Sequence, residues 1–400
     1  MLFSSTFLPS SLPARKIDNM LRVAIVGCGK IADAHAAQIQ RIADARIVAV
    51  CDREPLMAKQ LRERFRVESH FSDVEEMVYK ARPDIVHITT PPATHYPLAR
   101  LFLEKGCHVY VEKPFTLCTD EAHALIQQAN VSLCKLTVGH NEQFSHVARR
   151  MRKLVSSGYL GDTPVHMESN FGYDLGDPAY VRALLDDRQH WVRSLPGKLL
   201  QNIISHGIAR IAEFLTAESP RVLAVGFTSP FLKRLGEKEL IDELRVIITE
   251  DSGATAYFTF SSQMKPSIHE FRIYGSRNGL ILDQDHESLF KLRGKKYKSY
   301  ADKFSPPVQF ARQHLAAAAT NMQLFLRRDF HMESGMKTLI EEFYRCIQND
   351  TTVPIPYPEI LRTAKIMDMI FDQLRKTAPT HPTETCQAEV AASGQVLACT

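Results

Sequence analysis

The chain has 400 residues, more than one compact hydrophobic core usually supports, so we expect two domains. Hydrophobic residues make up 44% of the chain and charged residues 24%, which is typical of ordinary globular proteins. The net charge of +4 is too small for this length to mark a nucleic-acid-binding protein, and we expect no such partner.

The first nineteen residues, MLFSSTFLPSSLPARKIDN, form a poor signal peptide because no basic stretch precedes their short apolar run, which prolines interrupt. We expect residues 1–19 to be a disordered tail or the product of an upstream start codon. No apolar run approaches the roughly 18 to 20 residues that a membrane-spanning helix needs, so we expect no membrane association.

From Leu21 onward, strand-like runs alternate with helical patterns. The strand-like runs are LRVAIVG, RIVAVCD, DIVHITT, HVYVE and CKLTVG. Strands rich in Val and Ile without polar alternation indicate a parallel sheet that helices cover on both faces. Residues 20–142 are therefore predicted to form a doubly wound Rossmann domain that binds NAD(P).

The pattern changes after a linking helix at about residues 144–157. The runs TPVHMESNFGY, PRVLAVGFTS, LRVIITE, GATAYFTFSS, HEFRIYGS and GLILDQ follow one another with turns between them. This succession predicts a mostly antiparallel, open sheet in an α+β domain over residues 143–376, which would bind substrate and form oligomers. One helix, LLQNIISHGIARIAEFL, interrupts the strands, and two more at about 334–348 and 357–376 end the domain.

Two further stretches carry no predicted function. The densest basic stretch, KLRGKKYKSY at residues 291–300, is interpreted as a solvated loop. Residues 377–400 are small, polar and without a period, and we expect a disordered tail.

The eight cysteines show no CxxC pair, which favours a reducing, cytoplasmic location and excludes a disulfide framework. We also expect no metal site.

A glycine-rich turn follows the first strand and opens a helix. The first glycine allows the tight turn, the second lets the backbone approach a pyrophosphate, and Ala32 in the third place still permits close helix packing. The helix N-terminus supplies N–H groups and a partial positive charge for the phosphates. The candidate cofactor contacts in this turn are Gly27, Cys28, Gly29, Lys30 and Ile31.

The second strand ends in VCDRE, with Asp52 twenty residues after Ala32. A carboxylate at this place binds the ribose diol and repels a 2′-phosphate, which favours NAD over NADP. Arg53 leaves NADP open, since a guanidinium accommodates that phosphate. The alternative for Asp52 alone is a cap on the next helix.

The segment ITTPPATHYP ends the next strand at the carboxyl edge of the sheet, where such folds bind ligands. Thr90 and Pro91 are candidate cofactor contacts. His95 is a third candidate, although packing explains this histidine equally well.

The run HVYVEKPF places Lys113 at the same edge, beside the expected nicotinamide. A lysine that is desolvated there has a lowered pKa and can relay a proton or hold a substrate hydroxyl. Glu112 is predicted to pair with Lys113 or to contact the cofactor. Pro114 restricts the lysine to extended or turn geometry. The alternative is a surface ion pair at the end of a strand.

Together these features resemble the Gfo/Idh/MocA family, named for glucose-fructose oxidoreductase, inositol dehydrogenase and rhizopine-catabolism proteins. The matching pieces are GCGKIADAH, CDRE, TPPATH, GCHVYVEKPF, VGHNEQF and a helix with an Asn/Asp-x-x-x-His pair, within residues 20–376. The resemblance implies an NAD(P)-dependent oxidoreductase of sugars, cyclitols and related polyols. It also implies a homodimer or homotetramer formed through the open face of the C-terminal sheet, and a catalytic role for Lys113.

The second half of the site is predicted in LLQNIISHG. Asn202 and His206 are four residues apart and share one helical face, opposite an apolar stripe. A histidine there can take the substrate hydroxyl proton, and the resemblance makes His206 the general base. The alternative is a buried structural histidine. Asn202 stands where many family members carry aspartate, and an amide can orient the other two residues only through hydrogen bonds.

Four more residues complete the prediction. Asn141 in VGHNEQF is a candidate cofactor contact, and Gln143 stands where the family often has arginine. Trp191 and Arg193 in HWVRSLPG are candidate substrate contacts, with ordinary loop packing as the alternative.

The leading hypothesis is a dehydrogenase that transfers hydride between NAD and a sugar, cyclitol or nucleotide sugar. Two alternatives stay open at this point. One is a glycosidase or epimerase that uses tightly held NAD for transient oxidation. The other is a regulatory protein that binds the cofactor but has lost catalysis.

Overall fold

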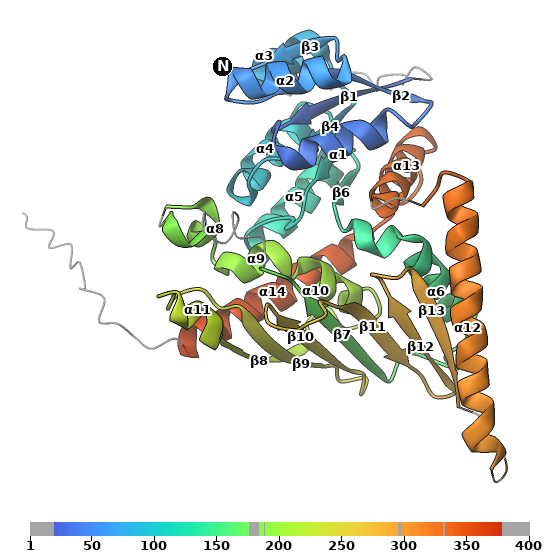
Figure 1. Cartoon of the computed structure of the whole chain (residues 1–400). Coiled ribbons are helices and arrows are strands. Elements are labelled where there is room, and N and C mark those ends of the chain that lie inside the picture. The colour runs from blue at the N-terminus through green and yellow to red at the C-terminus, as the bar shows by residue number, and fades with distance from the viewer. Residues whose placement is uncertain are drawn as a thin grey trace, which may run out of the picture.

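The computed structural model describes residues 20–175, 184–187, 189–294, 298, 300–330 and 333–377. Within them the chain forms two sheets with helices between them (Figure 1). The first has six strands in the order β3-β2-β1-β4-β5-β6, and the second has seven in the order β13-β12-β11-β7-β10-β9-β8. This architecture confirms the predicted fold class. The predicted disordered tails, 1–19 and 377–400, lie outside the described residues except for Thr377, which ends the last helix.

Every strand pair of the first sheet is parallel. Its strands are β1 (Leu21–Val26), β2 (Ala45–Cys51), β3 (Ser69–Phe71), β4 (Ile85–Ile88), β5 (His108–Val111) and β6 (Leu136–Val138). Its helices are α1 (Lys30–Ile39), α2 (Pro55–Phe65), α3 (Val74–Ala81), α4 (His95–Glu104) and α5 (Thr119–Val131). The strand order reverses between β1 and β4, which places a ligand crevice at the carboxyl ends of these strands.

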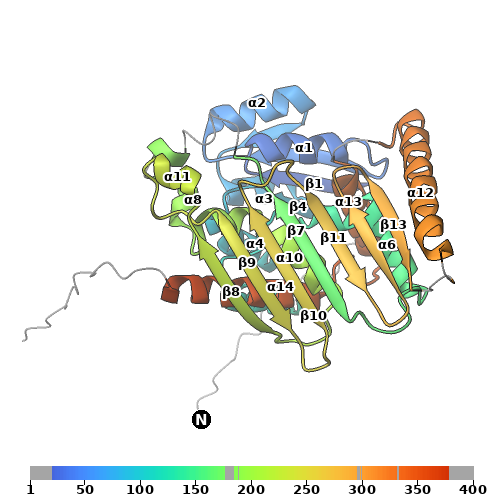
Figure 2. The same ribbon diagram turned by 60° about the horizontal axis from the view of Figure 1, so that its bottom comes forward.

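The second sheet is antiparallel except for the parallel pair β7 and β10. Its strands are β7 (His166–Gly172), β8 (Arg221–Phe227), β9 (Glu243–Thr249), β10 (Thr255–Ser261), β11 (His269–Tyr274), β12 (Asn278–Asp283) and β13 (Ser288–Arg293). The helices of this half are α6 (His146–Ser156), α8 (Trp191–Ser194), α9 (Lys198–Ile203), α10 (Ser205–Ala212), α11 (Pro230–Arg234), α12 (Ala301–Leu326), α13 (Ser334–Gln348) and α14 (Tyr357–Thr377). Helices α10 and α14 lie behind the sheet, and Figure 2 shows its open face toward the viewer.

The structure departs from the predicted elements in several places, and β3, α3, α8 and α11 match no predicted run or helix. The single helix expected around His206 is broken at Ile204, which ends α9 and precedes α10. Strand β13 includes Lys291–Arg293, so the first part of the predicted basic loop is strand. The 26-residue helix α12 was not predicted at all, because Pro306 and Pro307 within it are residues that normally end a helix.

Helix α13 packs on the first sheet although it follows the second sheet in the chain. Met336, Phe343 and Tyr344 of α13 are buried in the hydrophobic core that surrounds β1, β4 and β5. The first core is therefore completed by residues almost two hundred positions beyond the last strand of its sheet. No helix in the described part of the chain is long and apolar enough to cross a membrane.

Candidate active site

The turn between β1 and α1 has the geometry expected for a phosphate-binding loop. Gly27 has φ +93°, and a Cβ there would lie 2.7 Å from the backbone nitrogen of Thr90. Gly29 is the N-cap of α1 without a side-chain cap, and a Cβ there would meet nothing within 4 Å. Lys30 and Ile31 follow in the first helical turn, and Ala32 is completely buried. The open space over uncapped N–H groups fits a pyrophosphate.

Alanine substitutions at Gly27 and Gly29 are expected to affect different properties, stability in the first case and NAD affinity in the second. Gly27→Ala is expected to lower stability by about 1–3 kcal/mol, because the added methyl group combines a left-handed backbone with a clash at Thr90. Gly29→Ala, the matched control, is expected to unfold at the unchanged temperature yet to bind NAD at least about tenfold more weakly, a loss of about 1.4 kcal/mol. Thermal unfolding and calorimetric NAD titration separate the two effects, and unchanged NAD affinity in Gly29→Ala would contradict the assignment of this loop.

Asp52 closes the same loop from the end of β2. Its carboxylate accepts hydrogen bonds from the backbone N–H groups of Cys28 (2.7 Å) and Glu54 (2.9 Å). The N-cap of α2 is Glu54, so Asp52 is not itself the cap of the next helix. Arg53 is exposed beside it. Burial, followed by the Asp52 charge, raises the pKa of the Cys28 thiol to about 12, so Cys28 offers backbone contacts rather than a thiolate.

The segment after β4 lies against the glycine turn. Thr90 accepts a hydrogen bond from the Thr94 hydroxyl (2.7 Å), and Pro91 is exposed. His95 is completely buried, and its two ring nitrogens lie 2.8 Å from the carbonyl oxygens of Pro114 and Thr90. His95 thus ties two loops of the crevice together, which agrees with the packing interpretation rather than with a side chain that reaches a cofactor.

Lys113 extends from the end of β5 to the second half of the protein. Its ammonium group donates a hydrogen bond to the backbone carbonyl of Asn202 (2.9 Å). Burial lowers the pKa of Lys113, while the charges of Glu112 and Glu142 oppose the shift. The lysine therefore bridges the carboxyl edge of the first sheet and α9.

Glu112 pairs with a different group from the one predicted. Its ion-pair partner is His35 of α1 (2.9 Å), and it meets Lys113 only by accepting that residue's backbone N–H (3.1 Å). The other nitrogen of His35 lies 2.8 Å from Nδ1 of His87, and Nε2 of His87 lies 2.8 Å from the Tyr344 hydroxyl. A buried chain of four side chains thus runs from the lysine loop to α13.

The ion pair of Glu112 and His35 sets the direction of the hydrogen bonds in this chain. Burial would raise the pKa of Glu112, but the hydrogen bond and charge of His35 outweigh it and lower this pKa, so Glu112 is a carboxylate. Burial lowers the pKa of His87 and raises that of Tyr344, which keeps both neutral. With His35 protonated in this ion pair, both of its ring nitrogens donate, one to Glu112 and one to His87, and His87 donates to the Tyr344 hydroxyl. We call this set Tyr344, His87, His35 and Glu112 the relay.

His206 lies at the start of α10, close to Lys113. It is partly buried, and its Nδ1 finds no hydrogen-bond partner among the described residues. Burial and then the charge of Lys113 hold its pKa well below the ordinary value, so the ring is neutral and able to accept a proton. Asn202 contacts Lys113 through its backbone carbonyl rather than through its amide.

A small pocket adjoins His206. Its polar lining includes Glu142, Arg210 and His269, none of which sequence reasoning selected. Arg210 is buried and donates to the backbone carbonyl of Glu142 (2.9 Å), while its other terminal nitrogen has no partner among the described residues. Glu142 lies in the VGHNEQF segment, so that motif was the available signal.

The remaining predicted residues lie elsewhere. Arg193 forms a buried ion pair with Glu237 (2.6 Å), so the prediction of a substrate contact is not supported for its side chain. Trp191 is 39% exposed and stacks on His190. Asn141 begins the short 3-10 helix after β6 and is partly buried. Gln143 is buried and donates to Glu359 (2.7 Å). No group of three metal-ligating side chains occurs among the described residues.

Two family models match this chain. The model described as the oxidoreductase family with NAD-binding Rossmann fold, GFO_IDH_MocA, covers residues 21–140, and the GFO/IDH/MocA C-terminal domain covers residues 148–281. The chain belongs to the Gfo/Idh/MocA family. The oxidoreductase class and the NAD cofactor predicted from the sequence are thereby confirmed.

Individual relatives extend the comparison. The chain is 33% identical to the D-glucoside 3-dehydrogenase of Escherichia coli (strain K12) over 143 residues, which is 36% of this chain and 41% of that protein. It is 28% identical to the inositol 2-dehydrogenase of Rhizobium meliloti (strain 1021) over 268 residues, 66% of this chain and 76% of that protein. The WlbA dehydrogenase from Bordetella pertussis, solved with NADH and UDP-GlcNAcA, aligns with TM-score 0.72 at 16% identity over 90% of this chain and 97% of that one. This last likeness concerns the fold alone.

Proposed function

We propose that the protein is an NAD-dependent dehydrogenase that oxidises a secondary hydroxyl of a sugar, cyclitol or nucleotide sugar. The observation that carries the proposal is the position of a neutral His206 within the electrostatic reach of Lys113, beside a small pocket that polar side chains help to line. The relatives named as D-glucoside 3-dehydrogenase and inositol 2-dehydrogenase support this substrate class.

Each residue has a separate task in this proposal. NAD, held by the glycine turn and Asp52, supplies the hydride acceptor when bound. His206 removes the hydroxyl proton, since its pKa is far below neutrality and the ring is unprotonated at working pH. Lys113 donates a hydrogen bond to the substrate oxygen in place of the Asn202 carbonyl, which stabilises the developing negative charge. Asn202 keeps the lysine directed toward α9 until substrate binds.

The decisive experiment is an NAD-reduction screen across aldoses, cyclitols, glycosides and nucleotide sugars. We expect absorbance from NADH with at least one of these compounds. For that substrate kcat/KM is expected to stay constant as the pH falls from 7.5 to 6.5, because a lowered pKa keeps His206 in its basic form, and to decline only at lower pH.

Two results would count against the proposal. A decline of kcat/KM centred at or above pH 6.5 would contradict the assignment of His206 as the base. Tight NAD binding without NADH formation from any compound of these classes would favour the regulatory alternative, and product formation without NADH accumulation would favour transient oxidation.

We further propose a homo-oligomer in a reducing compartment such as the cytoplasm, with domain limits at 20–142 and 143–376. The apolar side chains exposed on the open sheet support an oligomer contact there: Leu223, Val225, Phe227, Ile247 and Tyr257. The six cysteines within the described residues are all free thiols, which supports the compartment.

A further inference from the structure

Helix α12 carries a stripe of apolar side chains that faces solvent. It lies between the end of the C-terminal family match and α13, and Figure 1 shows it beside β13, with one end beyond the sheet on the side away from the first sheet. The stripe consists of Phe304 (71% exposed), Val308 (60%), Leu315 (72%), Met322 (59%), Phe325 (63%) and Leu326 (74%). Their spacing of three, four or seven residues places them on one helical face.

The opposite face of α12 binds the edge of the sheet. Gln313 accepts from the backbone N–H of Lys291 (2.7 Å) and donates to its carbonyl (3.3 Å), so it occupies the free edge of β13. Asn321 donates to the backbone carbonyl of His286 (2.9 Å). Ala317 is the buried residue of this helix. Phe310 and Leu324, each seven residues from Ala317, are half-buried on the same side. The outward stripe is therefore a second apolar face of α12, beyond the inward one that surface helices normally have.

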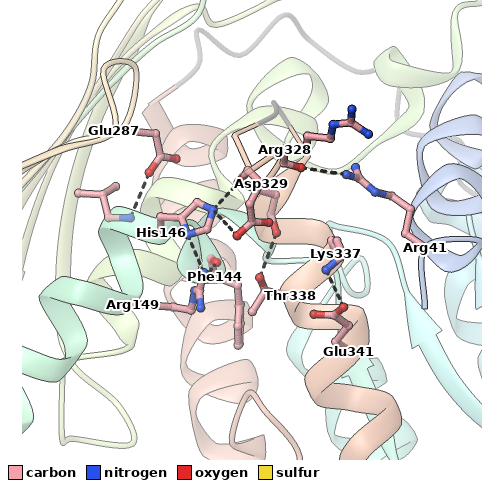
Figure 3. Close-up of polar contacts among 12 residues, drawn as sticks. Arg41, Phe144, His146, Arg149, Glu287, Arg328, Asp329, Lys337, Thr338 and Glu341 are labelled. Carbon is pink, nitrogen blue, oxygen red and sulfur yellow. Dashed lines mark hydrogen bonds and ion pairs between the residues drawn. The ribbon is translucent and has the colours of Figure 1, made fainter. Parts of the chain in front are cut away.

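The segment directly after α12 is also held by polar contacts (Figure 3). His146 of α6 forms a hydrogen bond with the Asp329 carbonyl (2.9 Å) and an ion pair with its carboxylate (3.5 Å). Arg41 donates to the carbonyl of Arg328 (3.4 Å). Contacts along the helix and after its end therefore fix its rotation, and the stripe is held outward.

The stripe has nearly the same order read from either end. Val308 and Met322 are each seven residues from Leu315, and alanines at positions 311 and 318 lie four and three residues from it. Phe304 and Phe325 lie at the two ends of the stripe, eleven and ten residues from Leu315. Such a sequence is complementary to itself in an antiparallel pair, as a two-fold contact between identical chains requires. The small residues near the centre permit close approach of two helices.

A second copy fits this stripe better than a lipid surface. Membrane-surface helices carry Lys and Arg along their polar face, but on the opposite face of α12 the polar residues Gln313 and Asn321 bind Lys291 of β13 and the carbonyl of His286. A 26-residue helix is about 39 Å long, which is ample for such a seam.

We propose that α12 pairs with α12 of a second copy, antiparallel, about a two-fold axis at Leu315. With the sheet contact proposed above, this pairing gives a tetramer, and alone it gives a dimer. The proposal does not depend on the substrate or on the chemistry at Lys113.

The test uses the full chain with Leu315→Cys, because only a residue at the axis meets itself and allows a disulfide. Mild oxidation is expected to give a covalent dimer whose linked peptides, identified by mass spectrometry, join position 315 to position 315. Tyr79→Cys, on the exposed surface of α3 with a similar exposure of 76%, is the matched control and is expected to give none.

Leu315→Glu is expected to halve the number of subunits measured by light scattering, while NAD affinity and melting temperature remain close to those of Tyr79→Glu. Three results would overturn the proposal: an unchanged subunit number without a 315–315 link, a link from position 315 to Cys386 or Cys399 of the same chain, or a monomer that sediments with phosphatidylserine vesicles through Leu315.

Discussion

Replacing Lys113 with methionine is expected to reduce kcat by about 10²–10⁴-fold while NAD affinity changes little. Methionine keeps an unbranched, flexible side chain but removes the ammonium group that the proposed reaction places against the substrate oxygen. The lost bond to the Asn202 carbonyl contributes about 0.5–1.5 kcal/mol, so the variant is expected to fold. Steady-state kinetics with the substrate found in the screen, with calorimetric NAD titration, measure the two quantities.

Lys135→Met is the matched control for this experiment. Lys135 forms a surface ion pair with Asp350, whose side chain is 91% exposed, so its loss is expected to leave kcat unchanged. Turnover of Lys113→Met within threefold of that control would refute a catalytic role for Lys113, whatever its effect on folding.

Replacing His35 with alanine is expected to destabilise the protein by about 3–5 kcal/mol at pH 7. The substitution leaves the Glu112 carboxylate buried without its ion-pair partner, and breaking such a pair from one side costs that amount. It also interrupts the relay at its third member. Urea unfolding at several pH values, with NAD affinity measured in parallel, checks the prediction.

The pH dependence of this difference has a definite sign. The folded-state pKa of Glu112 is lowered, so its contribution to stability is present above the unfolded value of about 4.5 and is lost as the pH falls through the folded value. The stability gap between the wild-type chain and His35→Ala is therefore expected to shrink below pH 4.5. His35→Gln retains an N–H donor for Glu112 and is expected to recover part of the loss. An equal gap at pH 4 and pH 7 would mean that packing rather than charge is responsible.

The sequence predicted the parts of the site that depend on local geometry. A glycine with φ +93° at Gly27 follows from the turn between a strand and a helix, and the position of Lys113 follows from the end of a buried strand. Both are consequences of short-range chain geometry and of the rule that parallel strands bring their carboxyl ends to one edge.

Other parts depend on contacts between distant segments. Tyr344 reaches His87 across 257 residues, and no local pattern indicates that pairing. Arg193 is two residues from the exposed Trp191 in the sequence, yet its side chain forms a buried ion pair with Glu237. Helix α12 contains two prolines and exposes a second apolar face, so both the rule for helix ends and the rule for apolar faces predict something else.

The position of α13 also has a consequence for synthesis. The strands of the first sheet are complete at Val138, but the core around them includes side chains from Met336 to Ile360. Domains usually fold as units while the chain is still emerging from the ribosome. The core of the first sheet therefore stays incomplete, with apolar surface exposed, until α13 has been synthesised. A ribosome stalled between β6 and α13 would thus present a protein that chaperones bind, although every strand of the nucleotide-binding sheet is already present.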